Sequence, residues 1–357
     1  MNTSHKNLSA ILIVADDKND LWPLELPRLP FACLPFLGGM TLLESAWHRI
    51  TPVVKKENIW FLCPPSACSL VAELLPDATQ ENIIPNELGT LAAVHTLSEM
   101  LREKTAAVTT PANPAITIVT RAAMIAGDEE SFVGVLRDAV RLAQGSDCLI
   151  ACGVPAKETR AGYDYIISGD ACVRAASVQG RDVRAFVVDA DQFEAQKAYQ
   201  SGNAWWNAGV YVWSTATFLS EYAAVCHEFG ADPERRETCS LEDALLSRTK
   251  NLLLFGASFV FSPLRNFEDI ARYLRGDVSG NMKVGNAALH NAEACFVYNS
   301  SPERLVVAGG LKNILIVQTK DAVFVCPRGD EGQIRLLVEE LVKKDPRILR
   351  YIEGASS

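Results

Sequence analysis

The sequence predicts an α/β protein with a doubly wound, mostly parallel sheet and a smaller β-rich C-terminal module. Two observations lead to this prediction. Up to about residue 154, short apolar runs alternate with amphipathic helical segments, the pattern of strands that are covered by helices on both faces. After residue 280, only short apolar runs recur until a final amphipathic segment, and closely spaced short strands indicate a separate β-rich part.

The first expected strand covers residues 9–15, a continuous apolar run. A buried parallel strand is covered on both faces, so it needs no polar alternation. A loop rich in Asp and Pro follows, and the next helix begins after Thr41. Thr41 and Glu44 have the spacing of a capping box, in which each side chain accepts a hydrogen bond from the other residue's backbone.

The other elements follow from the same two patterns, apolar runs for strands and a spacing of three to four residues for helices. In the alternating part, strands are expected at 59–63, 115–120 and 149–154, and helices at 66–75, 90–102 and 132–143. Beyond residue 163 the expected strands are 165–167, 210–213, 252–255 and 259–261, with helices at 192–200 and 241–249.

The C-terminal module is expected to contain five short strands and a closing helix. The strands are expected at 287–289, 295–298, 305–307, 314–317 and 323–325, and the helix at 334–344. Gly276, Ser279 and Gly280 cluster where the alternation of strands and helices gives way to short apolar runs alone. We therefore expect two domains, 1–278 and 279–357.

The composition argues against several classes of protein. A chain of 357 residues, 48% of them hydrophobic, can bury a sizeable core. A net charge of −9 argues against a nucleic-acid binder, which usually has a basic face. No membrane span or signal peptide is expected, because no run of 18 apolar residues occurs and the N-terminal apolar run ends in acids. Ten cysteines without a CxxC pair indicate buried, reduced thiols in a cytoplasmic protein rather than a zinc site.

Several short motifs occur in an order that resembles a known family. They are Leu21-Trp22-Pro23-Leu24, residues 34–43, Glu81-Asn82-Ile83-Ile84, Gly162-Tyr163-Asp164-Tyr165-Ile166, Trp206-Asn207-Ala208-Gly209 and the stretch 279–322. From about residue 9 to about residue 344 the chain resembles the mannose-1-phosphate guanylyltransferases, which are sugar-phosphate nucleotidyltransferases. The resemblance implies a Rossmann-like nucleotide-binding domain followed by a left-handed β-helix-like module.

The resemblance also implies a reaction, GTP + mannose-1-phosphate to GDP-mannose + pyrophosphate. Such a transfer depends on positioning, on neutralisation of phosphate charge and on a divalent metal, here Mg²⁺. The family's phosphate loop, AGGxGTRLWP, is replaced by residues 14–23, in which Ala15, Asp16 and Lys18 stand for the glycines and Asp20 for the arginine. This loop carries three acids and one lysine, so we expect a solvated acidic loop that repels a triphosphate. A rearranged metal-binding loop is the alternative.

Other positions that the family uses for phosphate and metal also differ. Phe31 stands for the lysine of PKQFLP, and Asp189 stands for the lysine of EKP. Residues 121–124 replace PADH, whose aspartate holds Mg²⁺ in the family, and contain no acid. Residues 90–94 replace RNTAP, and Pro263 stands at the second metal-binding aspartate. The sequence therefore assigns no catalytic residue and no metal ligand.

Three acids remain near these motifs, and the sugar side is retained. Asp128, Asp164 and Asp189 are expected to be a helix cap or exposed loop charges. The candidates for binding a sugar phosphate are Gly162 and Tyr163, which match the turn GYGYI, and Asn207, which matches the sugar-binding asparagine of WN(S/A)G. For Asn207 the alternative is a turn-stabilising role before Gly209.

These departures leave three functional hypotheses. The leading one is a catalytically impaired or inactive homologue that acts as a regulatory or assembly partner. The alternatives are an active nucleotidyltransferase with a rearranged site, which would need Mg²⁺, and a sugar-phosphate sensor. No other cofactor is expected. We expect a homo-oligomer, or association with an active nucleotidyltransferase subunit, through residues 280–330, and neither nucleic acid nor a membrane as partner.

Overall fold

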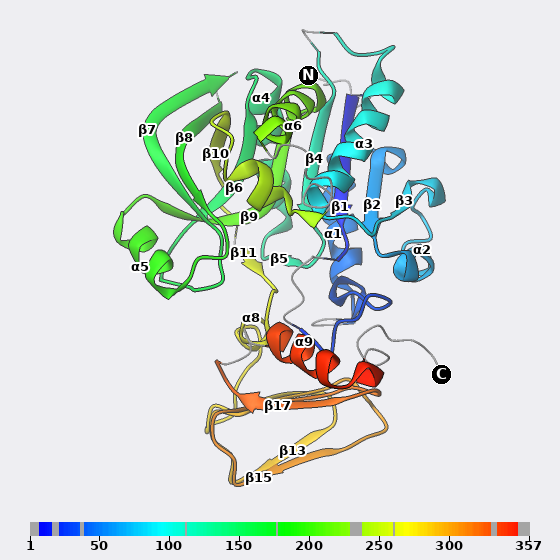
Figure 1. Ribbon diagram of the computed structural model, residues 1–357, viewed down its shortest axis with the longest axis vertical. Helices are drawn as coiled ribbons and strands as arrows, with labels where there is room; N and C mark the ends of the chain where they lie inside the picture. The colour runs from blue at the N-terminus through cyan, green and yellow to red at the C-terminus, as the bar shows by residue number, and fades with distance from the viewer. Residues whose placement is uncertain are drawn as a thin grey trace. The chain divides into compact units, whose positions relative to one another are not determined.

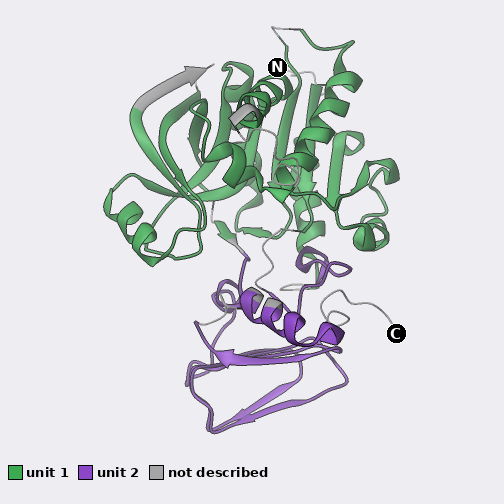
Figure 2. Cartoon of the chain, viewed as in Figure 1, with its two compact units in different colours: residues 1–17, 35–262 green, residues 18–34, 263–357 purple. Residues whose placement is uncertain are grey.

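The structure is a computed structural model that describes residues 7–15, 21–35, 39–110, 113–175, 178–228, 238–259, 261–329 and 334–348. Contacts between Cα atoms divide the chain into two compact units (Figure 2). Unit 1 comprises residues 1–17 and 35–262, and unit 2 comprises residues 18–34 and 263–357. In this division residues 18–34 group with the C-terminal part of the chain, whereas the domain limits 1–278 and 279–357 stay a prediction.

Unit 1 is built on a nine-stranded sheet of order β3-β2-β1-β4-β9-β6-β10-β8-β7 (Figure 1). The strands are β1 Leu8–Ile13, β2 Ile59–Cys63, β3 Ile83–Pro85, β4 Ile116–Arg121, β6 Leu149–Pro155, β7 Tyr165–Ala175, β8 Val178–Val187, β9 Ala204–Ser214 and β10 Leu252–Gly256. The first four strands in spatial order pair in parallel, and β10 is parallel to β6. Between them β9 runs antiparallel to both β4 and β6. The predicted α/β class with a parallel-rich sheet is confirmed.

Helices cover both faces of this sheet. They are α1 Leu42–Ile50, α2 Cys68–Leu74, α3 Thr90–Thr105, α4 Glu129–Gln144, α5 Gln192–Gln200 and α6 Thr215–Glu228. Ile11 and Ile13 of β1 pack into one core cluster with Leu97 of α3. Leu12, which alternates with them, is also fully buried, so both faces of β1 are covered, as expected for a continuous apolar run.

The predicted capping box at the start of α1 is confirmed. The Glu44 backbone N–H donates to Thr41 Oγ1 over 3.1 Å, and the Thr41 backbone N–H donates to Glu44 Oε2 over 2.7 Å. Several elements of unit 1 differ from the prediction. The strand expected at 165–167 is the first part of the long β7–β8 hairpin, and α6 was not expected.

Unit 2 contains two small sheets, β12-β14-β16-β17 and β13-β15. The strands are β12 Met282–Val284, β13 Ala287–His290, β14 Phe296–Asn299, β15 Val306–Gly309, β16 Ile314–Gln318 and β17 Val323–Pro327. Up to β16, successive strands alternate between the two sheets. Each of them pairs in parallel with the next strand of its own sheet: β12 with β14, β13 with β15 and β14 with β16. Ala287, Val297, Ala308 and Ile316 fill the interior. The predicted β-rich module is confirmed, as is its closing helix α9, Ile334–Lys344.

Short elements complete the two units. β5 (Met124–Ala126) pairs with β11 (Phe261–Pro263), and α8 covers Phe267–Ala271. Within the described ranges, no helix has the length and apolar character that a membrane span requires.

Candidate functional site

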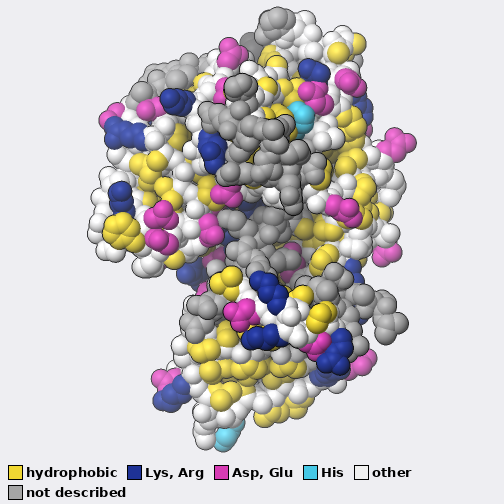
Figure 3. Space-filling model, viewed as in Figure 1, with side chains coloured by type: hydrophobic (Ala, Val, Ile, Leu, Met, Phe, Trp, Pro, Cys, Tyr) yellow, Lys and Arg dark blue, Asp and Glu magenta, His cyan; other side chains and the backbone are white. Residues whose placement is uncertain are grey.

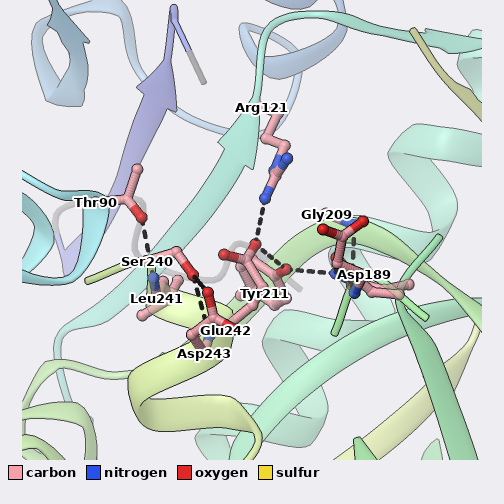
Figure 4. A network of polar contacts seen from close by, with 11 residues as sticks. Thr90, Arg121, Asp189, Gly209, Tyr211, Ser240, Leu241, Glu242 and Asp243 are labelled. Atoms are coloured by element: carbon pink, nitrogen blue, oxygen red, sulfur yellow. Dashed lines mark hydrogen bonds and ion pairs between the residues drawn. The ribbon is translucent and has the colours of Figure 1, made fainter. Parts of the chain in front are cut away.

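A buried network of polar side chains lies in unit 1 at the carboxyl end of β4 (Figure 4). Arg121, the last residue of β4, places Nη2 2.7 Å from Oε1 of Glu242. The same Glu242 oxygen accepts a hydrogen bond of 2.6 Å from the hydroxyl of Tyr211 on β9. The side chains of Arg121 and Glu242 are only 16% and 5% exposed, so the ion pair is largely removed from water.

Glu242 is the first residue of a segment that is not a regular α-helix. A helix was predicted for residues 241–249, but the structure has a π-helical turn, Glu242–Leu246, in which the Ser247 N–H donates to the Glu242 carbonyl. The Leu241 N–H donates to Thr90 Oγ1 over 3.0 Å at the start of α3. Single π-helical turns occur often at functional sites, and this one directs a carboxylate inward.

The electrostatics of the network follow from burial and from the ion pair. Burial on its own would raise the pKa of Glu242, but the charge of Arg121 and the hydrogen bonds from Tyr211 and Arg121 outweigh it, so the pKa of Glu242 is lowered. Burial, and then the charge of Glu242, raise the pKa of Tyr211 well above its ordinary value. Tyr211 therefore keeps its proton and donates a hydrogen bond to a charged Glu242.

Asn207 and Asp164 extend the network from β9 to the start of β7. Asn207 Nδ2 donates to the Tyr211 hydroxyl over 2.7 Å and to Asp164 Oδ2 over 3.2 Å. Asp164 Oδ1 accepts from the Asp189 backbone N–H over 2.9 Å. The Asn207 side-chain oxygen accepts from the Gly209 N–H over 3.1 Å. The alternative role for Asn207, stabilising the turn before Gly209, is thus present in the structure.

Gly209 is required by its conformation and by its neighbour. Its φ is +62°, a region that residues with a side chain rarely adopt. A Cβ atom at this position would also lie 3.3 Å from Cδ of Arg121. The glycine therefore allows Arg121 to pass beside β9 on its way to Glu242.

The three predicted sugar-side residues lie near one another around Asp164. Gly162 has a φ of +76°, and its N–H donates to the Ala190 carbonyl over 2.8 Å. Tyr163 is buried edge-on against Trp206, with ring centroids 5.7 Å apart. Asn207 binds Asp164, the residue after Tyr163. Whether these residues bind a sugar phosphate stays a prediction.

Arg160 belongs to the same region and was missed by the sequence analysis. Its guanidinium carbon lies 4.6 Å from the centroid of Trp206 and 5.2 Å from that of Tyr163. Its Nη1 donates to the Tyr163 hydroxyl over 2.9 Å. No local sequence signal pointed to it, because a lone arginine in a loop has no characteristic spacing.

The remaining acids have separate roles. Asp128 caps α4 and accepts from the Glu130 N–H over 3.2 Å, which confirms the expected helix cap. Asp189 is exposed, as expected, with a φ of +51°. Asp164 is buried, so the expectation of an exposed loop charge was wrong. The cause is the pair of hydrogen bonds that it accepts from Asn207 and from the Asp189 backbone.

The described residues do not fit the magnesium centre that the resemblance implies. Ala122, in the segment that replaces PADH, is completely buried, and the charged residue beside it is Arg121. In the part of the chain that the structure describes, no group of three or more His, Cys, Asp or Glu side chains is arranged to hold a metal ion. Phe31, which stands at a lysine position of the family, is buried within a short 3₁₀ turn. The acidic loop 16–20 lies outside the described residues.

Comparisons with known proteins agree with the motif order. A mannose-1-phosphate guanylyltransferase of Escherichia coli (strain K12) is 24% identical, over 96% of this chain and 75% of its own length. A second, from Salmonella typhimurium, is 26% identical over 95% of this chain and 74% of its own length. No family model matches the chain.

A solved structure has the same fold over nearly the whole chain. It is a crystal structure from Thermus thermophilus, described as a mannose-1-phosphate geranyltransferase, with a TM-score of 0.74 and 22% identity. The match covers 94% of this chain and 99% of that one. Similarity in sequence and in fold therefore extends along both units, and the chain is a divergent relative of the mannose-1-phosphate guanylyltransferases.

Proposed function

We propose that this chain is a catalytically impaired or inactive member of its family and acts as a regulatory or assembly partner. One observation carries the proposal: the segment expected to supply a magnesium ligand presents the Arg121–Glu242 ion pair and a buried alanine instead. Mg²⁺ prefers hard oxygen ligands in near-octahedral geometry. Here the charged group in the segment that replaces PADH is the guanidinium of Arg121, which repels a divalent cation.

The carboxylate of Glu242 does not replace the lost ligand. Its charge is already balanced by Arg121 at 2.7 Å, and its bonded oxygen also accepts from Tyr211. Recruiting Glu242 to a metal would leave Arg121 as an uncompensated charge in a largely buried position, which is strongly unfavourable. The site is therefore better suited to hold its own ion pair than to hold Mg²⁺ and a triphosphate.

The direct test measures pyrophosphate release from GTP and mannose-1-phosphate with Mg²⁺, using the full chain. We expect release indistinguishable from buffer, while the Escherichia coli relative, assayed in parallel, serves as the positive control. Turnover that is lost on Asp164→Asn or Asp189→Ala substitution would contradict the proposal. It would establish the alternative, an active transferase with a rearranged site.

A sugar-phosphate sensor is the second candidate, and the convergence of Tyr163, Asn207 and Asp164 favours it. The test is a calorimetric titration of the full chain with mannose-1-phosphate alone. A sensor would bind mannose-1-phosphate without GTP and would lose this binding on Asn207→Ala substitution. An absence of heat at millimolar ligand would eliminate this candidate and leave the assembly role.

A further inference from the structure

Unit 2 contains a cavity of about 560 Å³ that was not expected from the sequence. It is lined by the segment 21–34 and by the loops that follow β14 and β16. Its lining residues all belong to unit 2, so it is separate from the polar network of unit 1. Its volume lies within the range typical of small-molecule sites, about 300–1,000 Å³.

One wall of the cavity is apolar. It consists of Leu24, Leu26, Leu29 and Leu34, all from the segment 21–34. The turn that presents them is fixed by paired backbone hydrogen bonds between Leu26 and Leu29, of 2.8 and 3.2 Å. A preformed apolar wall favours a ligand with an apolar or ring-shaped body.

The loop after β14 contributes to the lining a buried hydroxyl without a partner among the described residues. Ser301 is only 8% exposed, and its Oγ makes no hydrogen bond to any of them. Its position is fixed, because the Ser301 N–H donates to Asn299 Oδ1 over 2.9 Å and Asn299 Nδ2 in turn donates to the Arg304 carbonyl over 2.7 Å. Buried polar groups are nearly always hydrogen-bonded, so this hydroxyl is suited to a ligand atom.

Arg28 adds a second donor of this kind. Its Nη2 binds Asp321 Oδ2 over 3.1 Å, but its Nε is buried and has no hydrogen-bond partner in the part of the chain that the structure describes. Arg304 and Lys320 also line the cavity. These three cations face two acids of the lining, Asp321 and Glu303. The lining therefore carries an excess of one positive charge, and this excess favours an anion.

We propose that this cavity binds a small organic phosphate monoester whose apolar or ring-shaped body lies against the leucine wall. Because Arg28 Nε and Ser301 Oγ are both buried in the free chain, their side chains turn toward the cavity on binding and donate to the phosphate oxygens, and Arg304 and Lys320 add positive charge. The arginine guanidinium is well matched to phosphate oxygens in charge and in geometry. The site goes beyond the function proposed for unit 1, because it uses none of the same residues.

The test is a calorimetric titration of the full chain with phenyl phosphate, which combines a ring with a phosphate. Inorganic phosphate and phenol carry the two halves separately, and we expect each to bind at least tenfold more weakly. Arg28→Gln and Ser301→Ala should each weaken phenyl phosphate binding about tenfold or more, the effect of losing a hydrogen bond to a charged group. Lys312→Gln removes an exposed charge of unit 2 outside the cavity lining and should leave binding unchanged.

Ser301→Ala keeps the test decisive if Arg28→Gln disturbs the pair with Asp321. The serine hydroxyl has no partner within the described ranges, so removing it costs them no hydrogen bond. Absence of phenyl phosphate binding at millimolar concentration would overturn the proposal. The proposal would also be overturned if the unmodified chain and all three variants bound phenyl phosphate with equal affinity. The same holds if inorganic phosphate bound as tightly as phenyl phosphate. None of these outcomes depends on pyrophosphate release, so this proposal and the one for unit 1 can fail separately.

Discussion

Arg121 Nη2 lies 2.7 Å from Glu242 Oε1, and the two residues are 121 positions apart in the chain. This contact ties the end of β4, in the middle of the sheet, to the π-helical turn after α6. Tyr211 completes it with a hydrogen bond to the same carboxylate oxygen. Because the pair is largely buried, the free energy of unfolding is expected to fall most when one partner is removed and the other is left charged.

The first prediction concerns the loss of one partner. Glu242→Ala leaves the Arg121 guanidinium uncompensated and should lower the free energy of unfolding by about 3–5 kcal/mol. Tyr211→Phe removes one hydrogen bond to a charged group and should cost less, about 1–3 kcal/mol. Both values can be measured by urea denaturation.

A surface ion pair provides the control for that experiment. Lys56 Nζ lies 2.6 Å from Asp77 Oδ2, but both side chains are more than half exposed. Asp77→Ala should therefore leave the midpoint of unfolding nearly unchanged. An equal loss of stability in Glu242→Ala and Asp77→Ala would contradict the importance assigned to burial.

The second prediction concerns acid. The pKa of Glu242 is lowered in the folded chain, so its ionised form stabilises the fold at pH values above the unfolded pKa, about 4.3. This contribution is lost as the pH falls below that value and through the lowered folded pKa. In Glu242→Gln, the free energy of unfolding should fall less steeply below about pH 4.3 than in the unmodified chain. If the free energy of unfolding falls equally steeply with pH in the two proteins, Glu242 does not contribute to the loss of stability in acid.

The third prediction tests the cap of α1. Thr41→Ala removes the side-chain oxygen that accepts the Glu44 N–H and should destabilise the protein by about 1 kcal/mol. Thr41→Ser keeps that oxygen and should be close to neutral. If thermal unfolding shows the same decrease for both variants, the loss comes from the threonine methyl group and not from the cap.

Features that depend on neighbouring residues were predictable from the sequence. Apolar runs predict the strand β1 and the short strands of unit 2, and the helical spacing of apolar residues predicts α9. The spacing of two residues predicts the capping box of α1. The β7–β8 hairpin was underestimated, because β8 has no continuous apolar run and no regular alternation of buried and exposed residues beyond its first four positions. The helix α6 was also missed.

The candidate site was only partly predictable. Tyr163 and Asn207 were found through their motifs, and Asp164 lies in the first of these motifs. The Arg121–Glu242 pair could not be found in this way, because its two halves lie in distant segments and meet only through the order of the sheet. A helical periodicity near residue 242 also concealed the π-helical turn that directs Glu242 inward.

The last prediction concerns association through the β-rich module. β17 lies at the edge of its sheet and pairs with β16 on one side. Val323 and Val325 on this strand are 58% and 57% exposed, whereas Phe324 between them is buried. Figure 3 shows further apolar side chains in rows over the same module. An exposed apolar edge strand is a ready template for pairing with another chain.

We therefore expect the full chain to be a stable oligomer at tens of micromolar in light scattering. The double substitution V323K/V325K places two charges on the edge strand and should produce monomers that remain folded, because both side chains face solvent in the single chain. V278K, a charge added at another exposed valine of unit 2, is the matched control and should leave the oligomer intact. A full chain that is monomeric at this concentration, and that does not associate with an active mannose-1-phosphate guanylyltransferase added in equal amount, would remove the support for the assembly role. An oligomer that survives V323K/V325K would instead place the interface away from β17.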